Sequence, residues 1–189
     1  MRKSDTPTGE ACNLPNLYLV GFMGTGKSAV GRQLAQRLSM EWIDSDQAIE
    51  AHLGRTIPEI FATEGEAFFR QQERAFVESG HPAHGCVVST GGGLVVEPGM
   101  SALLQTKGVV IGLFARPETI LERVGSGTNR PMLAGEGDPI ERITELLKKR
   151  EPFYLAAGAG VSTDLRPMCD IVDHVERLYR RLAKAFQSG

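Results

Sequence analysis

The stretch Leu17-Tyr-Leu-Val-Gly21-Phe-Met-Gly24-Thr-Gly26-Lys27-Ser28 decides the fold of this chain. It opens with a short apolar run that is typical of a β-strand and continues into a glycine-rich turn. The residues that follow, Ala29–Leu38, carry apolar side chains at helical spacing. In this context Gly21–Ser28 matches G-x-x-x-x-G-K-S, the P-loop pattern, which requires a strand before it and a helix after it.

Each residue type in this P-loop has a chemical purpose. Glycines allow consecutive backbone N–H groups to turn inward around an anion, and the N-terminus of the next helix adds partial positive charge. Lys27 can bridge the β- and γ-phosphates of a nucleotide, and the Ser28 hydroxyl can bind Mg²⁺. The alternative is a glycine-rich connection that only turns the chain, but a chance match is expected about once in 100 chains of this length. The pattern predicts a nucleoside triphosphate site.

Composition bounds the other possibilities. A chain of 189 residues is expected to form one domain with its own core. The net charge of −2 and the pI of about 6.1 give no bulk attraction to nucleic acid or to an anionic membrane, so we expect neither as a partner. The three cysteines are an odd number and are widely spaced, and no apolar run approaches the length of a membrane span. These features predict reduced thiols in the cytoplasm.

Strand and helix patterns alternate along the chain, which predicts a parallel sheet covered by helices on both faces. After the first strand, further strands are predicted over Glu41–Asp46, Cys86–Ser89, Val109–Phe114 and Gly160–Thr163. Beyond the P-loop helix, helices are predicted over Gln47–Leu53, Glu64–Ser79, about 99–105, Pro117 to about Val124, Asp138 to Arg150 and Met168–Gln187, with a short one capped by Thr56 and Glu59.

Two acidic residues follow the second strand. Asp44 and Asp46 lie two positions apart, so on a strand their side chains would leave the same face. Open α/β sheets bind ligands at the carboxyl ends of their strands, where one acid can hold Mg²⁺ through water and the other can meet a substrate hydroxyl. The alternative is that Asp46 caps the next helix, which would leave Asp44 without a role.

A charged face is predicted on the long helix. Arg70, Glu73 and Arg74 recur at helical spacing, and this pattern is also typical of a solvated salt-bridge face. The pair Phe68-Phe69 directly before Arg70 favours partial burial instead. A buried arginine needs an acidic partner, either from a ligand or from Glu73.

Two further segments are candidates for ligand contact. Gly91-Gly92-Gly93 follows a buried strand, and three glycines indicate close approach of a ligand to backbone N–H groups, although a sharp bend with positive φ is the alternative. Arg130 lies in a glycine-rich and proline-rich stretch of about 125–139, which is typical of a lid. An arginine there can stabilise a transferring phosphoryl group, or it can simply be solvated.

Taken in this order, the P-loop, Asp44-x-Asp46, Phe69-Arg70-x-x-Glu73, Gly91–Gly93, Arg130-Pro131 and Arg150 with Tyr154 resemble shikimate kinase. The resemblance implies a P-loop NTPase of the nucleoside-monophosphate-kinase-like α/β fold, with a five-stranded parallel sheet flanked by helices and a lid. The N-terminal residues are polar and include Pro7 and Gly9, which predicts a flexible extension over residues 1–14. The resemblance covers nearly all of the rest and implies a single domain over residues 15–189, with the lid over about 125–139. The implied reaction is phosphorylation of the 3-hydroxyl of shikimate by ATP, on the way to chorismate and the aromatic amino acids.

The resemblance also implies roles for single residues. The expected catalytic residues are Lys27, Asp46 and Arg130; the expected nucleotide contacts are Gly24, Thr25, Gly26, Lys27, Ser28, Ala29, Arg130 and Arg166. The expected shikimate contacts are Asp46, Arg70, Glu73, Gly91, Gly92, Gly93 and Arg150, with Glu73 orienting Arg70. One Mg²⁺ per subunit is expected, bound by Ser28 and with Asp44 in its outer shell. Many members carry Thr at the position of Ala29, so a hydroxyl near the α-phosphate is missing here.

The expected partners are ATP and shikimate, and the expected assembly is a monomer. Two alternatives stay open on the sequence. One is a related small-molecule kinase resembling gluconate kinase, which would not need Arg70 and Arg150 placed for a cyclic acid. The other is a nucleotide-binding regulatory domain that has lost catalysis, although Lys27, Ser28, Asp46 and Arg130 are all present.

Overall fold

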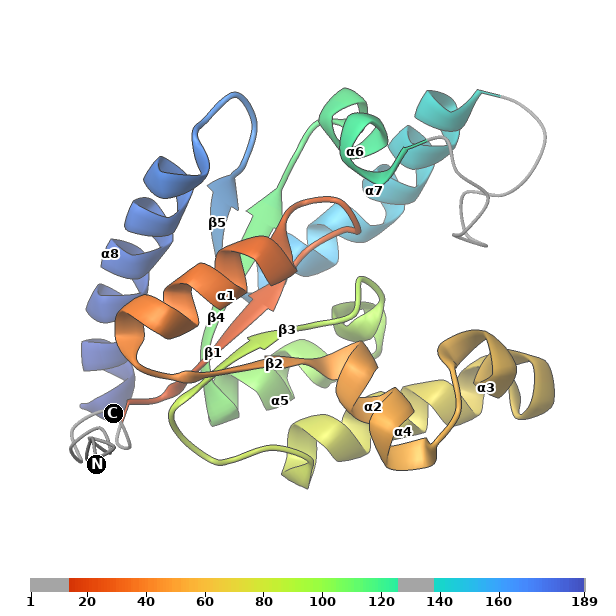
Figure 1. Cartoon of the computed structure of the whole chain (residues 1–189), viewed down its shortest axis with the longest axis horizontal. Helices are drawn as coiled ribbons and strands as arrows, with labels where there is room; N and C mark the ends of the chain where they lie inside the picture. The colour runs from red at the N-terminus through yellow and green to blue at the C-terminus, as the bar shows by residue number, and fades with distance from the viewer. Residues whose placement is uncertain (1–13, 126–137, 189) are drawn as a thin grey trace, which may run out of the picture.

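A five-stranded parallel sheet forms the centre of the molecule (Figure 1). The computed structural model describes residues 14–125 and 138–188. The strand order is β2-β3-β1-β4-β5, and each neighbouring pair runs parallel. The strands are β1 (Asn16–Val20), β2 (Glu41–Asp44), β3 (Cys86–Ser89), β4 (Gly108–Phe114) and β5 (Ala159–Ser162). The fold predicted from the alternating pattern is confirmed.

Helices connect the strands as parallel pairing requires. They are α1 (Lys27–Leu38), α2 (Ser45–Leu53), α3 (Ile57–Thr63), α4 (Gly65–Ser79), α5 (Met100–Lys107), α6 (Pro117–Val124), α7 (Pro139–Ala157) and α8 (Met168–Gln187), with a 3₁₀ turn η2 (Leu94–Val96). The predicted capping box is present, because Thr56 accepts from the Glu59 backbone and Glu59 accepts from the Thr56 backbone. Gly54 and Gly80 end their helices as predicted.

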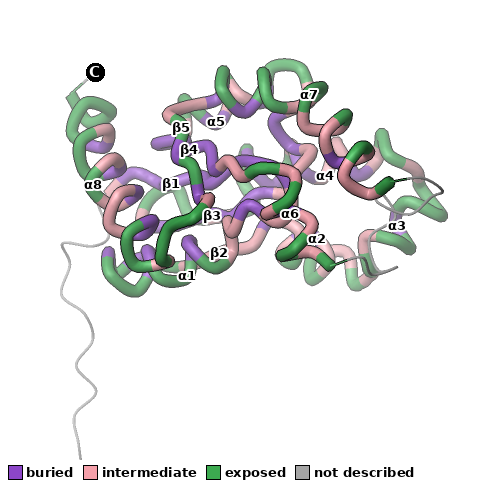
Figure 2. The backbone as a smooth tube through the Cα atoms, turned by 90° about the horizontal axis from the view of Figure 1, so that it is seen from above, coloured by how far each residue is buried: buried purple, intermediate pink, exposed green. Residues whose placement is uncertain are grey.

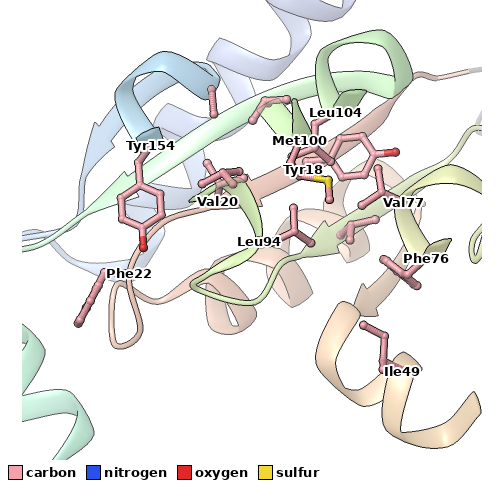
Figure 3. Close-up of a cluster of buried hydrophobic side chains, with 14 of the residues drawn as sticks. Tyr18, Val20, Phe22, Ile49, Phe76, Val77, Leu94, Met100, Leu104 and Tyr154 are labelled. Atoms are coloured by element: carbon pink, nitrogen blue, oxygen red, sulfur yellow. The ribbon is translucent and has the colours of Figure 1, made fainter. Parts of the chain in front are cut away.

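The sheet separates two apolar clusters. Alternate residues of β1 enter opposite clusters, with Tyr18 and Val20 on one face and Leu17 and Leu19 on the other. Helices α1 and α8 cover the face of Leu17, while α4, α5 and α7 cover the face of Tyr18. The three central strands β3, β1 and β4 are buried between them, whereas the edge strands β2 and β5 are partly exposed (Figure 2). Figure 3 shows part of the Tyr18 cluster, with Tyr154 of α7 and Phe22 at one end of it. Burial on both faces explains the nearly continuous apolar runs of β1 and β4.

Two predicted element boundaries differ from the structure in ways that bear on the site, whereas several others differ by only one or two residues. Strand β2 ends at Asp44 and not at Asp46, because Asp44 begins the next helix as its N-cap. Helix α7 does not end at Arg150 but continues past Pro152 to Ala157. Pro152 removes one backbone donor, whose usual acceptor would be the carbonyl of Lys148, an exposed residue that water can reach. The burial of Tyr154 and Ala157 beyond the proline holds the last turn.

The carboxyl edge of the sheet gathers the functional segments. The P-loop follows β1, Asp44 ends β2, the three-glycine turn follows β3, and α6 follows β4. Open α/β sheets bind their ligands at this edge. In the described part of the chain, no helix combines the length and the apolar character that crossing a bilayer requires.

Candidate active site

The P-loop adopts a backbone that only glycine accommodates easily. Gly21, Gly24 and Gly26 have φ angles of 139°, 77° and 94°, in the region that favours glycine. Gly26 is the N-cap of α1, and no side chain caps the first N–H groups of that helix. Because these donors point out of the helix start, the loop forms a concave site for an anion.

Lys27 and Ser28 open α1 and face different partners. The Lys27 ammonium donates hydrogen bonds to the carbonyl oxygens of Gly21 at 2.8 Å and Phe22 at 2.9 Å, so its charge lies over the loop. The Ser28 hydroxyl donates to Asp44 Oδ2 at 3.1 Å. This contact ties the start of α1 to the end of β2 and places a hydroxyl and a carboxylate side by side.

The two acids after β2 differ in their roles. Asp44 Oδ1 accepts hydrogen bonds from the backbone N–H of Asp46 at 3.2 Å and of Gln47 at 3.4 Å, so Asp44 caps α2. The interpretation that Asp46 caps this helix is therefore wrong, as is the expectation that both acids leave one strand face. Burial, followed by the Asp44 carboxylate, raises the pKa of Asp46, and Lys27 opposes that rise. A raised pKa makes Asp46 a stronger proton acceptor than an exposed aspartate.

A cavity of about 350 Å³ joins the P-loop to these acids. Its wall includes the following predicted site residues: Gly24, Gly26, Lys27, Ser28, Ala29, Asp44, Asp46, Gly91 and Gly92. The P-loop and the three-glycine turn, which lie far apart in sequence, therefore share one cavity.

Arg70 and Glu73 form a buried ion pair on α4. Arg70 Nη1 lies 2.6 Å from Glu73 Oε2, and the exposed fractions of the two side chains are 17% and 1%. Arg70 Nη2 also pairs with Glu66 Oε1 at 2.7 Å. The solvated-face alternative does not apply to this pair, whereas Arg74 and Glu78 lie on the exposed part of the helix, with exposed fractions of 42% and 52%.

Glu73 is an unusual carboxylate. Burial raises its pKa to about 7, against the opposing effect of Arg70. Within the residues that the structure describes, its buried Oε1 atom has no hydrogen-bond partner. Buried oxygens are almost always paired in folded proteins, so this atom marks a place where a ligand or water can donate.

The three-glycine turn needs its glycines for space. None of Gly91, Gly92 and Gly93 has positive φ, so the alternative of a strained bend does not apply. A Cβ atom on Gly91 would lie 2.6 Å from Asp46 Oδ1 and 3.0 Å from Glu73 Oε1. One on Gly93 would lie 2.7 Å from Arg70 Nη1. The absent side chains let the turn pack directly against these three charged groups.

Arg150 reaches the site from α7. Its guanidinium carbon lies 5.9 Å from the centroid of the Phe22 ring, and the Phe22 carbonyl accepts from Lys27. Arg150 is therefore next to the P-loop. Gly93 packs against Arg70, and a Cβ on Gly92 would lie 3.4 Å from the Met23 nitrogen. Neither arginine is among the described residues that line the P-loop cavity itself. Both predicted substrate arginines adjoin segments that contact the P-loop.

Arg123 was missed by the sequence reasoning. It lines the P-loop cavity from α6 and donates to Thr163 Oγ1 at 2.9 Å, to the Thr163 carbonyl at 2.8 Å and to the Gly24 carbonyl at 3.3 Å. A basic residue in the last turn of a helix is common for electrostatic reasons alone, so the local sequence gives no signal. The signal is tertiary, because Gly24 packs on α6: a Cβ there would lie 2.9 Å from Val124 Cγ1.

Three predicted nucleotide contacts, Thr25, Arg130 and Arg166, are not among the described residues that line the P-loop cavity. The Thr25 hydroxyl is buried and donates to the Phe22 carbonyl at 2.8 Å, so its side chain serves the loop. Arg166 is exposed in the turn between β5 and α8, outside the described lining of the P-loop cavity. Arg130 lies outside the described residues, as does most of the predicted lid over about 125–139.

Comparison with known proteins identifies what this chain is similar to. The family model for shikimate kinase matches residues 23–179. A shikimate kinase of Caldanaerobacter subterraneus subsp. tengcongensis is 40% identical over 169 residues, 89% of this chain and 98% of the relative. The structure of Acinetobacter baumannii shikimate kinase in complex with shikimate matches with a TM-score of 0.81 and 37% identity, over 88% of this chain and 93% of the other.

A gluconokinase from Sinorhizobium meliloti 1021 also matches, with a TM-score of 0.60, 19% identity and coverage of 93% and 98% of the two chains. At that identity the likeness shows the fold alone.

Proposed function

The chain belongs to the shikimate kinase family, and we propose that it transfers the γ-phosphoryl group of ATP to the 3-hydroxyl of shikimate. The products are shikimate 3-phosphate and ADP. The observation that supports this most directly is the single cavity where the P-loop, Asp46 and the three-glycine turn meet beside the Arg70–Glu73 pair. A cradle of backbone amides for a polyphosphate, next to a carboxylate and a paired guanidinium, suits transfer to a hydroxyl of a small acid.

The nucleotide would lie on the P-loop side. The backbone N–H groups of Gly24–Ala29 would surround its phosphates, and Lys27 would move its ammonium from the loop carbonyls to the γ-phosphoryl group. Arg130 would add a second positive charge there, and Arg123 and Arg166 would approach the nucleotide from α6 and from the turn after β5. Positioning and charge stabilisation carry this kind of reaction, because the protein makes no covalent bond to the phosphoryl group.

Shikimate would lie between the three-glycine turn and α7. Arg70 and Arg150 would bind its carboxylate through charge-assisted hydrogen bonds, and Glu73 would hold Arg70 in place. Gly91–Gly93 would supply backbone donors. Asp46 would accept a hydrogen bond from the attacking hydroxyl and take its proton, which the raised pKa of this carboxyl favours.

The donor set beside the P-loop fits Mg²⁺. Mg²⁺ keeps several waters and takes one or two protein ligands together with substrate phosphates. Ser28 Oγ and Asp44 Oδ2 supply such a pair at 3.1 Å from each other, and among the described residues no cluster of three or more His, Cys, Asp or Glu could hold a metal ion alone. When bound, one ion per subunit would neutralise charge on the phosphates. A monomeric state and a cytoplasmic location stay predictions.

A coupled assay of ADP release tests the proposal. The purified protein is supplied with ATP and Mg²⁺, and with shikimate, gluconate or no acceptor. We expect ADP release that depends on shikimate. Release that depends on gluconate instead would support the related small-molecule kinase. ATP binding without release for any acceptor would support a regulatory domain that has lost catalysis.

A further inference from the structure

Tyr154 holds the middle of the three-glycine turn from outside. Its side chain is 1% exposed, and its hydroxyl donates a hydrogen bond to the Gly92 carbonyl at 2.6 Å. Burial raises the pKa of Tyr154 to about 12, against the opposing charge and hydrogen bond of Arg150. A side chain of α7 therefore contacts the backbone of a turn that is 62 residues away in sequence.

The other carbonyls of this turn are held locally. The Gly91 carbonyl accepts from the Leu94 N–H at 3.3 Å, and the Gly93 carbonyl accepts from the Val96 N–H at 3.0 Å. The Gly92 carbonyl instead accepts from Tyr154. Three glycines in a row have more backbone freedom than any other tripeptide, so the middle peptide needs an external contact to keep one orientation.

This contact has a directional consequence for the substrate side. In a trans peptide the C=O and N–H groups point in opposite directions, so fixing the Gly92 carbonyl toward Tyr154 turns the Gly93 N–H away from it. Gly93 packs directly against the Arg70 guanidinium. The orientation of the Gly92–Gly93 peptide therefore sets the direction of the Gly93 N–H beside the Arg70 guanidinium. In the proposed function, that guanidinium binds the substrate carboxylate.

Tyr154 also shares a helix face with a substrate arginine. It lies four residues after Arg150, so the two side chains leave α7 on the same side. Arg150 lies over the Phe22 ring, and Tyr154 lies at the same end of the apolar cluster as Phe22 (Figure 3). One turn of α7 thus contacts both the P-loop segment and the three-glycine turn.

We propose that Tyr154 is a positioning residue, which fixes the Gly92–Gly93 peptide for the acid substrate. Because Tyr154 and Arg150 share one face of α7, the same contact also positions this peptide relative to Arg150. The inference rests on the proposed function, because it concerns how that site selects its acceptor. A simpler interpretation is that the Gly92 carbonyl only provides a hydrogen-bond acceptor for the buried Tyr154 hydroxyl, so that the contact contributes to stability alone. A control variant separates the two interpretations.

Tyr179 is a matched control. Its hydroxyl donates to the Pro15 carbonyl at 2.6 Å, its side chain is fully buried, and burial raises its pKa to about 12. It belongs to the cluster on the opposite face of the sheet, away from the P-loop cavity. Tyr179→Phe therefore removes the same kind of hydrogen bond without touching the three-glycine turn.

The experiment compares Tyr154→Phe with Tyr179→Phe in steady-state kinetics and thermal unfolding. Both variants should lose similar stability. We expect Tyr154→Phe to raise the KM for shikimate about threefold to tenfold, the loss expected for one neutral hydrogen bond, with the KM for ATP unchanged. Tyr179→Phe should change neither KM. Equal KM values for shikimate in the two variants would overturn the inference, whereas absence of shikimate-dependent ADP release in the wild-type protein would instead overturn the proposed function.

If Tyr154→Phe does not fold, the wild-type protein supplies the test. Exchange of the Gly93 amide hydrogen is followed by NMR with and without shikimate. Slower exchange with shikimate is the expected result, because the proposal presents this donor to the substrate side. An exchange rate that shikimate does not change would overturn it.

Discussion

The two glycine turns at the carboxyl edge of the sheet use glycine for different reasons. In the P-loop, the glycines have positive φ, so the backbone conformation itself requires them. In the turn after β3, none has positive φ, and a side chain at Gly91 or Gly93 would meet Asp46, Glu73 or Arg70. One turn needs conformational freedom and the other needs space.

This difference follows from what each side of the cavity recognises. On the nucleotide side the loop turns backbone N–H groups toward a polyanion, which any nucleoside triphosphate presents. On the acceptor side, charged side chains that are largely buried pack closely against the backbone, and the proposed function gives them one small acid to bind. Substitutions on the nucleotide side should therefore change folding or kcat, and those on the acceptor side should change the affinity for shikimate.

The largest effect is expected from the nucleotide side. Arg130→Ala should lower kcat by about 10³-fold or more, because arginines that neutralise a transferring phosphoryl group contribute that much elsewhere. The KM for shikimate should change little. Arg180→Ala is the control, since this arginine is exposed on α8 and pairs with Glu176 at 2.8 Å. A variant that keeps its kcat while losing affinity for shikimate would reverse the roles assigned to the two sides.

Alanine substitutions in the two glycine turns compare them directly. Gly21→Ala should lower the free energy of unfolding by about 1–3 kcal/mol or more, because its φ of 139° is strained for alanine and its Cβ would clash with the Leu113 carbonyl. Gly91→Ala should cost less stability, because its Cβ would meet the ends of two side chains, Asp46 Oδ1 at 2.6 Å and Glu73 Oε1 at 3.0 Å, and no backbone atom.

The cost of Gly91→Ala should appear in catalysis instead. The added Cβ would lie only 2.6 Å from Asp46 Oδ1, so the Asp46 carboxylate must move away from it. This displacement should lower kcat/KM for shikimate by about 10²-fold, as misplaced catalytic groups do elsewhere. Chemical denaturation and steady-state kinetics on both variants check this pair of outcomes. If Gly91→Ala unfolds as readily as Gly21→Ala, the two turns use glycine for the same reason and the comparison fails.

A smaller effect is expected from Arg70, to which the proposed function gives the substrate carboxylate. Arg70→Ala should raise the KM for shikimate by roughly 10- to 100-fold, which corresponds to the loss of charge-assisted hydrogen bonds of about 1.5–3 kcal/mol. Arg74→Ala, on the same helix but exposed, is its control. The kcat of both should stay close to the wild-type value. A fall in kcat at unchanged KM for Arg70→Ala would place this arginine at the phosphoryl group.

The parts of the site that sequence reasoning found are those encoded locally. The P-loop is a contiguous pattern, and Arg70 and Glu73 are three residues apart on one helix, so spacing alone predicts their contact. Which of Asp44 and Asp46 caps α2 was not predictable in this way. Both acids can cap a helix, and the position where β2 ends decides which one does.

Contacts between distant segments could not be predicted from local patterns. Arg123 meets Thr163 across 40 residues, and Tyr154 meets Gly92 across 62. Arg123 does not stand out locally, and Tyr154 does so only through the family resemblance, because a basic residue at a helix end and a tyrosine among apolar neighbours are both common. Strand order decides these contacts, since β1 between β3 and β4 brings α6 and the three-glycine turn to the two sides of the P-loop.

The smallest effect concerns pH and tests the acceptor side alone. The pKa of Glu73 is raised by burial to about 7, above the ordinary value of 4.5. The folded state then holds a proton that the unfolded state has lost between these values. Stability from this group is therefore full below about pH 4.5 and declines as pH rises through about 7.

Glu73→Gln removes this proton-binding site while keeping the shape of the side chain. Relative to the wild-type protein, its free energy of unfolding should rise by about 1–3 kcal/mol between pH 4.5 and pH 8. Asp46 titrates in both proteins, so the part of its contribution that does not depend on Glu73 cancels in the difference. Urea denaturation at several pH values measures the difference, with Glu78→Gln on the exposed side of α4 as the control. If the difference does not change with pH, Glu73 is ionised over this whole pH range. The attraction of Arg70 then outweighs the effect of burial on the pKa of Glu73, which would contradict the prediction.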